Sequence, residues 1–160
     1  MLRRKYIFKK FLPRLCSVGL FFILFSFKDL GSLHQLIQQT VLKLNAAYNL
    51  NGESVQIRKF DLQITENGFF RYKKYLISGK QEYYSFNLLQ FNDLDYLGNI
   101  NSGTLTLRTL NDDIIVQSFN DPKGDIDSMA FQVDIPVKEI EAEDLQDIRK
   151  NFLSMKKQLQ

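Results

Sequence analysis

The hydrophobic pattern changes its period twice along the chain, and this change limits the fold more than any other feature. Apolar residues first recur at helical spacing on one face, at Leu33, Leu36, Ile37, Val41, Leu44 and Tyr48. From Ser54 to Pro136 they alternate with polar residues, as in strands that bury one face. Helical spacing then returns at Leu145, Ile148, Phe152, Met155 and Leu159. We therefore predict an α+β domain, with a bulged antiparallel sheet or partly closed barrel of about six to seven strands between an N-terminal helix and an amphipathic C-terminal helix.

Local signals refine this prediction. Ser32 and Gln35 fit a capping box at the start of the first helix. A one-residue slip in the alternation at Arg58-Lys59 predicts a β-bulge, because a strand otherwise stays in phase. The Asn67-Gly68 pair predicts a hairpin with a tight type I′ turn. Residues Phe91 to Gly98 fit either a short strand or a turn of helix.

The first 28 residues have a different composition. Residues 1–14 hold six cations and no acid, and Leu15 to Phe27 is an uncharged run of 13 residues. As a helix this run would be roughly 20 Å long, short of the roughly 30 Å core of a bilayer. A basic segment before a short apolar run is typical of a secretory signal.

No clear cleavage site follows the run, so residues 1–28 are a signal peptide or an uncleaved N-terminal anchor. The anchor would keep its basic end in the cytoplasm. Both alternatives predict export of the single domain 32–160 to the periplasm or outside the cell. Cys16 opens the apolar run, whereas a lipid-bearing cysteine should follow it, so we do not expect lipidation.

Composition excludes several classes of function. One Cys and one His exclude a disulfide framework, a cysteine-cluster zinc site and any mechanism that needs two imidazoles. The net charge of +3 belongs to the basic head, because from Asp29 onward 14 Lys and Arg stand against 18 Asp and Glu. An acidic domain argues against nucleic acid as a partner.

A basic cluster is the first candidate site. Cross-strand neighbours lie about 5 Å apart, so the cations on both sides of the predicted hairpin would form one anion-binding patch beside an aromatic residue. Its members are Arg58, Lys59, Arg71, Lys73, Lys74 and Tyr72. The alternative is that the lysines are solvated and protect a sheet edge, and that the nearby tyrosines pack in the core.

An acidic loop is the second candidate. The segment Asn120 to Asp127 offers oxygen ligands and a glycine, so Asp121, Asp125 and Asp127 are candidate ligands for calcium. The spacing fails the EF-hand pattern and Lys123 lies in the middle, so a plain connection between strands, with no cofactor, is the favoured interpretation.

Catalysis has little support in the sequence. His34 is the single imidazole and falls beside the apolar stripe of its helix. Aspartates are common in turns because their side chains bond nearby backbone. We therefore favour a binding function. A hydrolase that uses loop aspartates such as Asp121 and Asp125 is the alternative.

The order of the predicted elements resembles the pleckstrin-homology superfold, in which antiparallel strands with a bulged first hairpin precede an amphipathic C-terminal helix. Lys59, Arg71, Tyr72 and Lys73 resemble the basic hairpin with which some members hold phosphoinositides. The chain departs from that family because it has no Trp in the closing helix. Glu82 to Asn87 and Asn120 to Asp127 also resemble segments of small uncharacterised exported bacterial proteins.

The sequence thus favours an exported, non-catalytic binding module whose partner is a protein or a small ligand. It would touch a membrane only through an uncleaved N-terminal segment. The other alternative is a membrane-anchored accessory subunit.

Overall fold

The computed structural model describes residues 33–160, which form an α+β domain with two antiparallel sheets. Residues 33–47 form the N-terminal helix, and α2 spans Ala142–Gln158. The strands are β1 (Ile57–Ile64), β2 (Phe69–Leu76), β3 (Gln81–Asn87), β4 (Phe91–Asn99), β5 (Ser102–Thr109), β6 (Ile114–Phe119), β7 (Asp127–Ala130) and β8 (Gln132–Val137). Two 3-10 turns, η1 (Leu50–Gly52) and η2 (Leu88–Gln90), complete the described elements. The predicted capping residue Ser32, Cys16 and the segment 1–28 lie outside the described residues.

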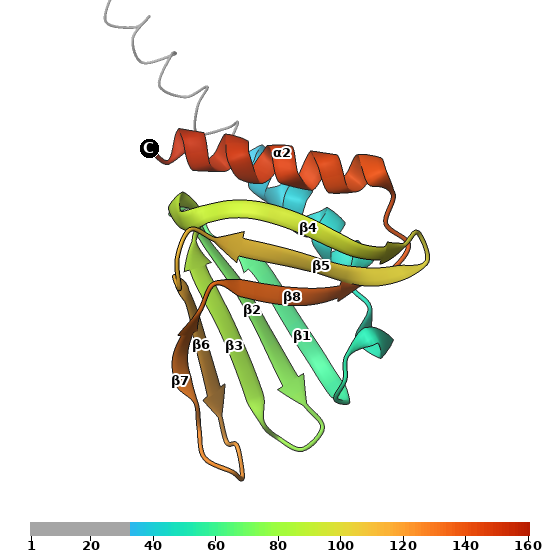
Figure 1. Ribbon diagram of the computed structural model, residues 1–160, viewed down its shortest axis with the longest axis vertical. Helices are drawn as coiled ribbons and strands as arrows, with labels where there is room; N and C mark the ends of the chain where they lie inside the picture. Colours follow the sequence, from blue (N-terminus) through green and yellow to red (C-terminus); the bar gives the residue numbers. More distant parts are fainter. Residues whose placement is uncertain (1–32) are drawn as a thin grey trace, which may run out of the picture.

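The two sheets have different sizes and directions. One has the order β1-β2-β3-β6-β7 and the other the order β4-β5-β8, and their strands cross steeply (Figure 1). The α+β class with a bulged antiparallel sheet between two helices is confirmed. The described region holds eight strands rather than six or seven, and neither sheet closes into a barrel.

The first hairpin carries the predicted bulge. The register of β1 against β2 shifts between Ile57 and Lys59, so the slip in the alternation is confirmed. The turn type is wrong, however. A type I′ turn needs positive φ at both central residues, whereas only Gly68, at φ 79°, has it. A Cβ at Gly68 would lie 2.4 Å from Leu159 Cδ1, so this position also brings the C-terminus onto the hairpin.

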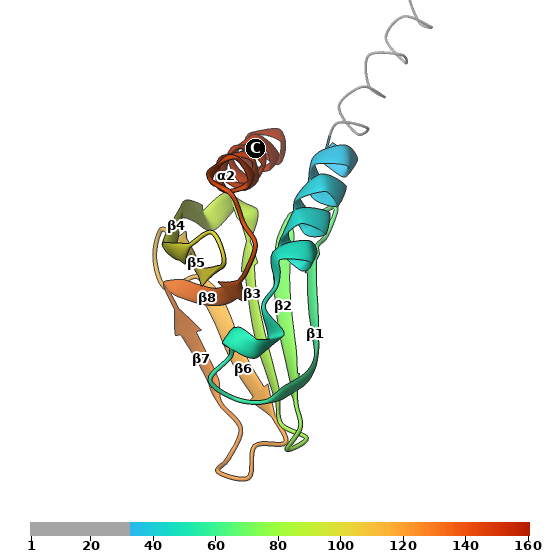
Figure 2. The ribbon, with the colours of Figure 1, turned by 90° about the vertical axis from the view of Figure 1, so that its right-hand side faces the viewer.

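The segment that the sequence left open, Phe91 to Gly98, is a strand. It forms an edge of the three-stranded sheet, and α2 runs beside it (Figure 2). The Arg149 side chain donates to the Leu94 carbonyl and pairs with Asp93 at 2.9 Å. Lys156 donates to the Phe91 carbonyl at 2.7 Å. These cations occupy backbone acceptors that an edge strand otherwise presents to solvent.

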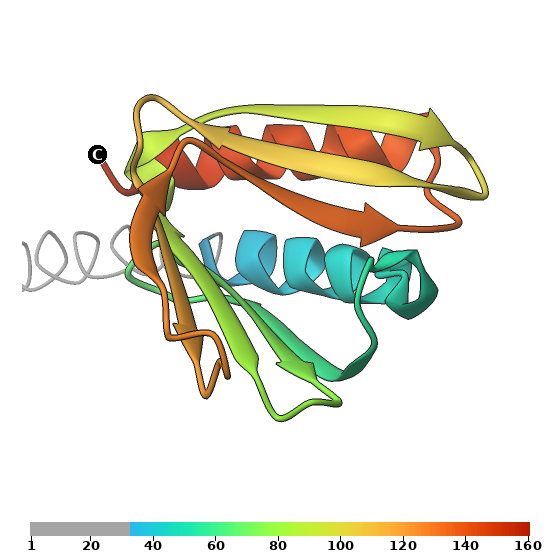
Figure 3. The ribbon, with the colours of Figure 1, turned by 60° about the horizontal axis from the view of Figure 1, so that its bottom comes forward.

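The two helices lie close to each other and help to close the core (Figure 3). Lys43 of the N-terminal helix reaches Asp144 and Asp147 of α2, each at 2.7 Å. The predicted stripe of α2 faces inward, with Ile148, Phe152 and Met155 fully buried. The acidic first turn and basic last turn of α2 suit the helix dipole.

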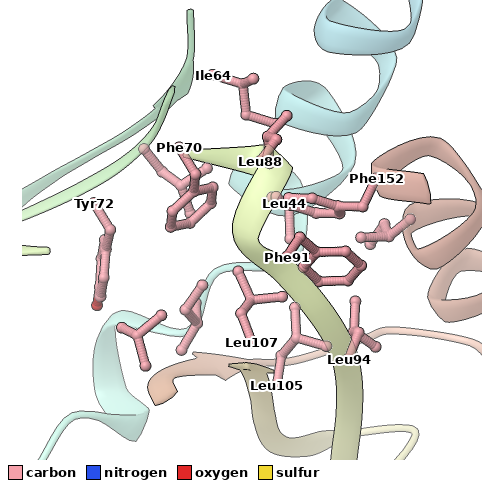
Figure 4. Close-up of a cluster of buried hydrophobic side chains, with 14 of the residues drawn as sticks. Leu44, Ile64, Phe70, Tyr72, Leu88, Phe91, Leu94, Leu105, Leu107 and Phe152 are labelled. Atoms are coloured by element: carbon pink, nitrogen blue, oxygen red, sulfur yellow. The ribbon is translucent and has the colours of Figure 1, made fainter. Parts of the chain in front are cut away.

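Phe152 is the aromatic residue of α2 at the centre of the core (Figure 4). Its ring stacks on Phe91 at 4.9 Å between centroids and lies 6.1 Å from the ring of Phe70. It therefore joins α2 to both sheets, through β4 and β2.

We expect Phe152→Ala to lower the free energy of unfolding by about 3–5 kcal/mol, because it removes a large buried side chain and leaves a cavity. Urea denaturation followed by circular dichroism measures the loss. Leu153→Ala is the matched control; this neighbour is 48% exposed, and its loss should stay below about 1 kcal/mol. Equal losses in the two variants would contradict the assignment of Phe152 to the core.

Candidate functional site

The pleat of β2 divides the predicted basic patch between two faces of the sheet. Tyr72 and Lys74 point inward in phase with the buried residues Phe70 and Leu76. Arg71 and Lys73 lie on the outer face. Successive residues of a strand point to opposite faces, so one patch cannot contain all the cations of β2. The structure thus separates Lys74 from the other lysines.

Lys74 belongs to a buried polar network. Its Nζ atom lies 3.3 Å from Glu53 Oε2 and 2.9 Å from Glu82 Oε2. The side chains of Lys74 and Glu53 are only 10% and 7% exposed. Glu82 is the direct cross-strand partner of Lys74 in β3. A buried ammonium therefore has two carboxylates as neighbours, as a buried charge requires.

Two tyrosines complete the hydrogen bonds of Glu53. The hydroxyl groups of Tyr48 and Tyr72 donate to Glu53 Oε1 at 2.8 Å and 2.6 Å. The two phenol oxygens are 2.7 Å apart. Glu53 thus accepts hydrogen bonds from the end of the N-terminal helix and from β2, and its other oxygen accepts from Lys74.

Local structure brings Glu53 to this place. Tyr48 forms an isolated β-bridge with Val137 of β8, and the Asn49 N–H donates to the Pro136 carbonyl at 2.9 Å. The Asn49 side chain accepts from the Asn51 N–H and opens the turn η1. The segment Asn49 to Gly52, which follows the N-terminal helix, therefore directs Glu53 inward.

The network fixes the charge state of its members. Burial and the adjacent Glu53 carboxylate raise the pKa of both Tyr48 and Tyr72, which stay neutral. Burial lowers the pKa of Lys74, but Tyr84, Glu82 and Glu53 outweigh it and the pKa is raised. Burial similarly acts to raise the pKa of Glu82, yet its hydrogen bonds and charge attraction to Lys74 and Lys80 hold it below its ordinary value.

A pocket of about 420 Å³ lies above this network, where β8 passes over the inner face of β2 and β3. We call it the inter-sheet pocket. Lys74 and Tyr84 line it from the five-stranded sheet and Glu53 from the segment after η1. The remaining lining residues are Gly52, Ser54, Thr104, Gln132, Val133, Asp134 and Pro136. Hydrogen-bond donors and acceptors thus surround a partly apolar surface.

The other predicted cations lie on the outer face or in the bulge. Arg58 and Lys59 are exposed, and Arg71 and Lys73 are half-buried. The Lys59 and Lys73 ammonium groups lie 5.5 Å and 4.9 Å from the centre of the Tyr75 ring. These four cations form no ion pair with the described residues. Lys59 and Lys73 thus lie beside the same ring, whereas Arg71 lies opposite Gln63, farther along the strand. Tyr72 and Lys74 face the other side of the sheet.

The three loop aspartates make separate contacts. Asp121 pairs with Lys80 at 2.8 Å, Asp125 accepts from the Asp121 N–H, and Asp127 accepts from Gln117. Among residues 33–160, no group of three or more His, Cys, Asp and Glu side chains is placed to hold a metal ion. His34 is exposed. Its Nδ1 atom lies 2.6 Å from Glu66 Oε1, and its Nε2 atom lies 2.7 Å from Gln38 Nε2.

The sequence missed the acceptor at the centre of this site. Glu53 lies in a segment without hydrophobic period, so no pattern singled it out. Lys74 was grouped with the outer cations, although its position in phase with Phe70 and Tyr72 was a usable signal for an inward side chain. Glu82 begins the segment Glu82 to Asn87, in which no pattern indicates an ion pair.

The chain matches no family model, no curated protein and no solved structure in the comparisons with known proteins. The resemblances in layout and in short segments therefore stay predictions. In the described part of the chain, no helix is long and apolar enough to span a membrane.

We expect Lys74→Met to lower the free energy of unfolding by about 3 kcal/mol, because it leaves two carboxylates facing each other without the cation between them. Lys73→Met, one position along on the outer face, should cost less than about 1 kcal/mol. Urea denaturation at neutral pH measures both. A similar cost for the two substitutions would show that the buried network does not contribute to stability.

The lowered pKa of Glu82 predicts that the stability of the protein depends on pH. A carboxyl whose pKa is lower in the folded protein stabilises it at neutral pH, and this contribution disappears as the pH falls below 4.5 toward the folded pKa. Glu82→Gln should therefore be less stable than the wild type at neutral pH and lose less stability in acid. Thermal melts between neutral and acidic pH test this, and parallel curves for the two proteins would refute it.

Proposed function

We propose that this chain is an exported, non-catalytic binding protein whose ligand occupies the inter-sheet pocket. The pocket itself is the observation that carries the proposal. Its volume of about 420 Å³ lies within the usual range for small-molecule sites. Its wall contains a buried ammonium and a buried carboxylate whose positions are fixed by hydrogen bonds. Fixed polar groups of this kind orient a ligand.

The charges of the pocket favour an uncharged ligand. Lys74 is its cation, and two carboxylates already neutralise it, so a second anion gains little. Glu53 already accepts three hydrogen bonds, which leaves it little capacity for a ligand cation.

The polar and apolar groups together suit a ligand rich in hydroxyl groups. Thr104 and Ser54 carry hydroxyls, Gln132 carries an amide, and Asp134 carries a carboxylate at the rim. Tyr84 and Pro136 supply apolar surface between them. A sugar ring has hydroxyl groups around its edge and C–H groups on its faces, so a mono- or disaccharide fits this distribution.

Two features favour binding over catalysis. The raised pKa of Lys74 keeps its amino group protonated, which makes it a hydrogen-bond donor and not a base or nucleophile. The single histidine is on the surface beside Glu66. Export is supported by the basic head and the apolar run Leu15 to Phe27.

The test measures ligand binding directly. The full chain is titrated calorimetrically with glucose, maltose and inositol, and with succinate and putrescine as an anion and a cation of small size. We expect heat of binding, and a rise in melting temperature, with at least one of the uncharged probes. Binding of a charged probe alone, or of no probe, would overturn the proposed ligand class.

Gln132→Ala should weaken the binding of that probe about tenfold, because it removes an amide from the pocket wall. Gln63→Ala is the matched control, since Gln63 is an exposed residue on the other face of β1. It should leave the affinity unchanged. An equal effect of both substitutions would place the bound probe outside the inter-sheet pocket.

A further inference from the structure

The backbone of β7 is open on one side. β7 is the edge strand of the five-stranded sheet and pairs only with β6. The Ile126 carbonyl accepts from the Ser118 N–H at 2.9 Å, so in the alternating antiparallel pattern Ser128 and Ala130 also turn their backbone groups toward β6. The N–H and C=O groups of Asp127 and Met129 point away. Within residues 33–160 no hydrogen bond reaches them.

The edges of β4 and β8 have partners in the described structure. The carbonyls of Phe91 and Leu94 in β4 accept from Lys156 and Arg149 of α2. At the edge of β8, the Pro136 carbonyl accepts a hydrogen bond from the Asn49 N–H. Proteins usually protect edge strands in such ways, because unpaired backbone groups attract another strand. The edge of β7 has no such protection.

Large apolar side chains surround this open edge. Five of them are 36–54% exposed on and beside β6 and β7, namely Ile115, Phe119, Ile126, Met129 and Phe131. Ile115 and Met129 are cross-strand partners and lie on the same outer face. A cluster of exposed apolar residues next to unpaired backbone is typical of an interaction surface.

We propose that β7 pairs antiparallel with β7 of a second copy of this chain, about a two-fold axis at Ser128. In this register Asp127 lies opposite Met129 of the second copy, and Met129 lies opposite its Asp127. Each outward N–H and C=O of these residues then meets a complementary group. The five-stranded sheets of the two copies join into one continuous sheet.

The side chains suit this register. Asp127 faces a methionine and not a second aspartate, so no like charges stand directly opposite each other. Ser128, small and exposed, faces its own counterpart. The Ile115–Met129 pair of one copy lies beside the Gln117–Asp127 pair of the other, so apolar and polar side chains alternate across the contact. The same surface thus serves both partners, as a two-fold contact requires.

A designed disulfide tests the register. Ser128 and its counterpart would form a non-hydrogen-bonded pair with Cα atoms about 4.5 Å apart, within the range for a disulfide. In the full chain with Cys16→Ser, which removes the only native cysteine, Ser128→Cys should therefore oxidise to a covalent dimer. Ser78→Cys, in the exposed turn after β2, is the matched control and should stay monomeric. Equal cross-linking of both variants, or none at Ser128, would overturn the register.

Association without a cysteine is measured by sedimentation of the full chain up to roughly 100 µM, because a contact built on one short strand is weak. Wild type should form dimers, and Met129→Lys should raise the dissociation constant at least about tenfold. Leu97→Lys, at a residue that is 82% exposed on β4, should leave it unchanged. A wild type that stays monomeric would overturn the proposal. So would association that survives Met129→Lys, which would locate the contact elsewhere, for example at Leu15 to Phe27.

Discussion

The buried Glu53 carboxylate is the interaction on which the arrangement of this domain depends. It accepts hydrogen bonds from Tyr48, Tyr72 and Lys74. It thereby ties the end of the N-terminal helix to β2 of the larger sheet, while the backbone of Asn49 ties the same segment to β8. A buried carboxylate without these donors would cost several kcal/mol. The hydrogen bonds of Glu53 therefore fix the position of the N-terminal helix relative to the sheets. The apolar packing of Phe70, Phe91 and Phe152 is less directional and would tolerate several arrangements.

The same network accounts for the form of the inter-sheet pocket. Lys74 of β2 and Glu82 of β3 are cross-strand partners. Along the same face, the residues on one side of this pair are apolar. At one end of this face, Phe70 packs against Phe86 and against Phe152 of α2. At the other end the polar side chains face the edge of β8 and leave space between them. One face of one sheet thus serves as core at one end and as pocket wall at the other.

Much of the fold followed from local patterns, because those patterns depend on neighbours in sequence. The bulge at Lys59, the hairpin at Gly68 and the stripe of α2 needed only period and turn chemistry. The order of the sheets did not follow, since β3 pairs with β6 and not with β4, and that choice depends on contacts distant in sequence. For the candidate site, the inward position of Lys74 was readable from the pleat of β2. Its partner Glu53 lies 21 residues earlier in an irregular segment, where only the folded chain brings the two together.

The contact between Gly68 and Leu159 has a consequence for the order of synthesis. The last turn of α2 packs on the first hairpin, and Phe152 and Met155 of the same helix fill the core. A ribosome releases the N-terminal parts of a chain first, so the strands emerge before the helix that completes their packing. The strands of the described domain therefore complete their core only when α2 has also left the ribosome.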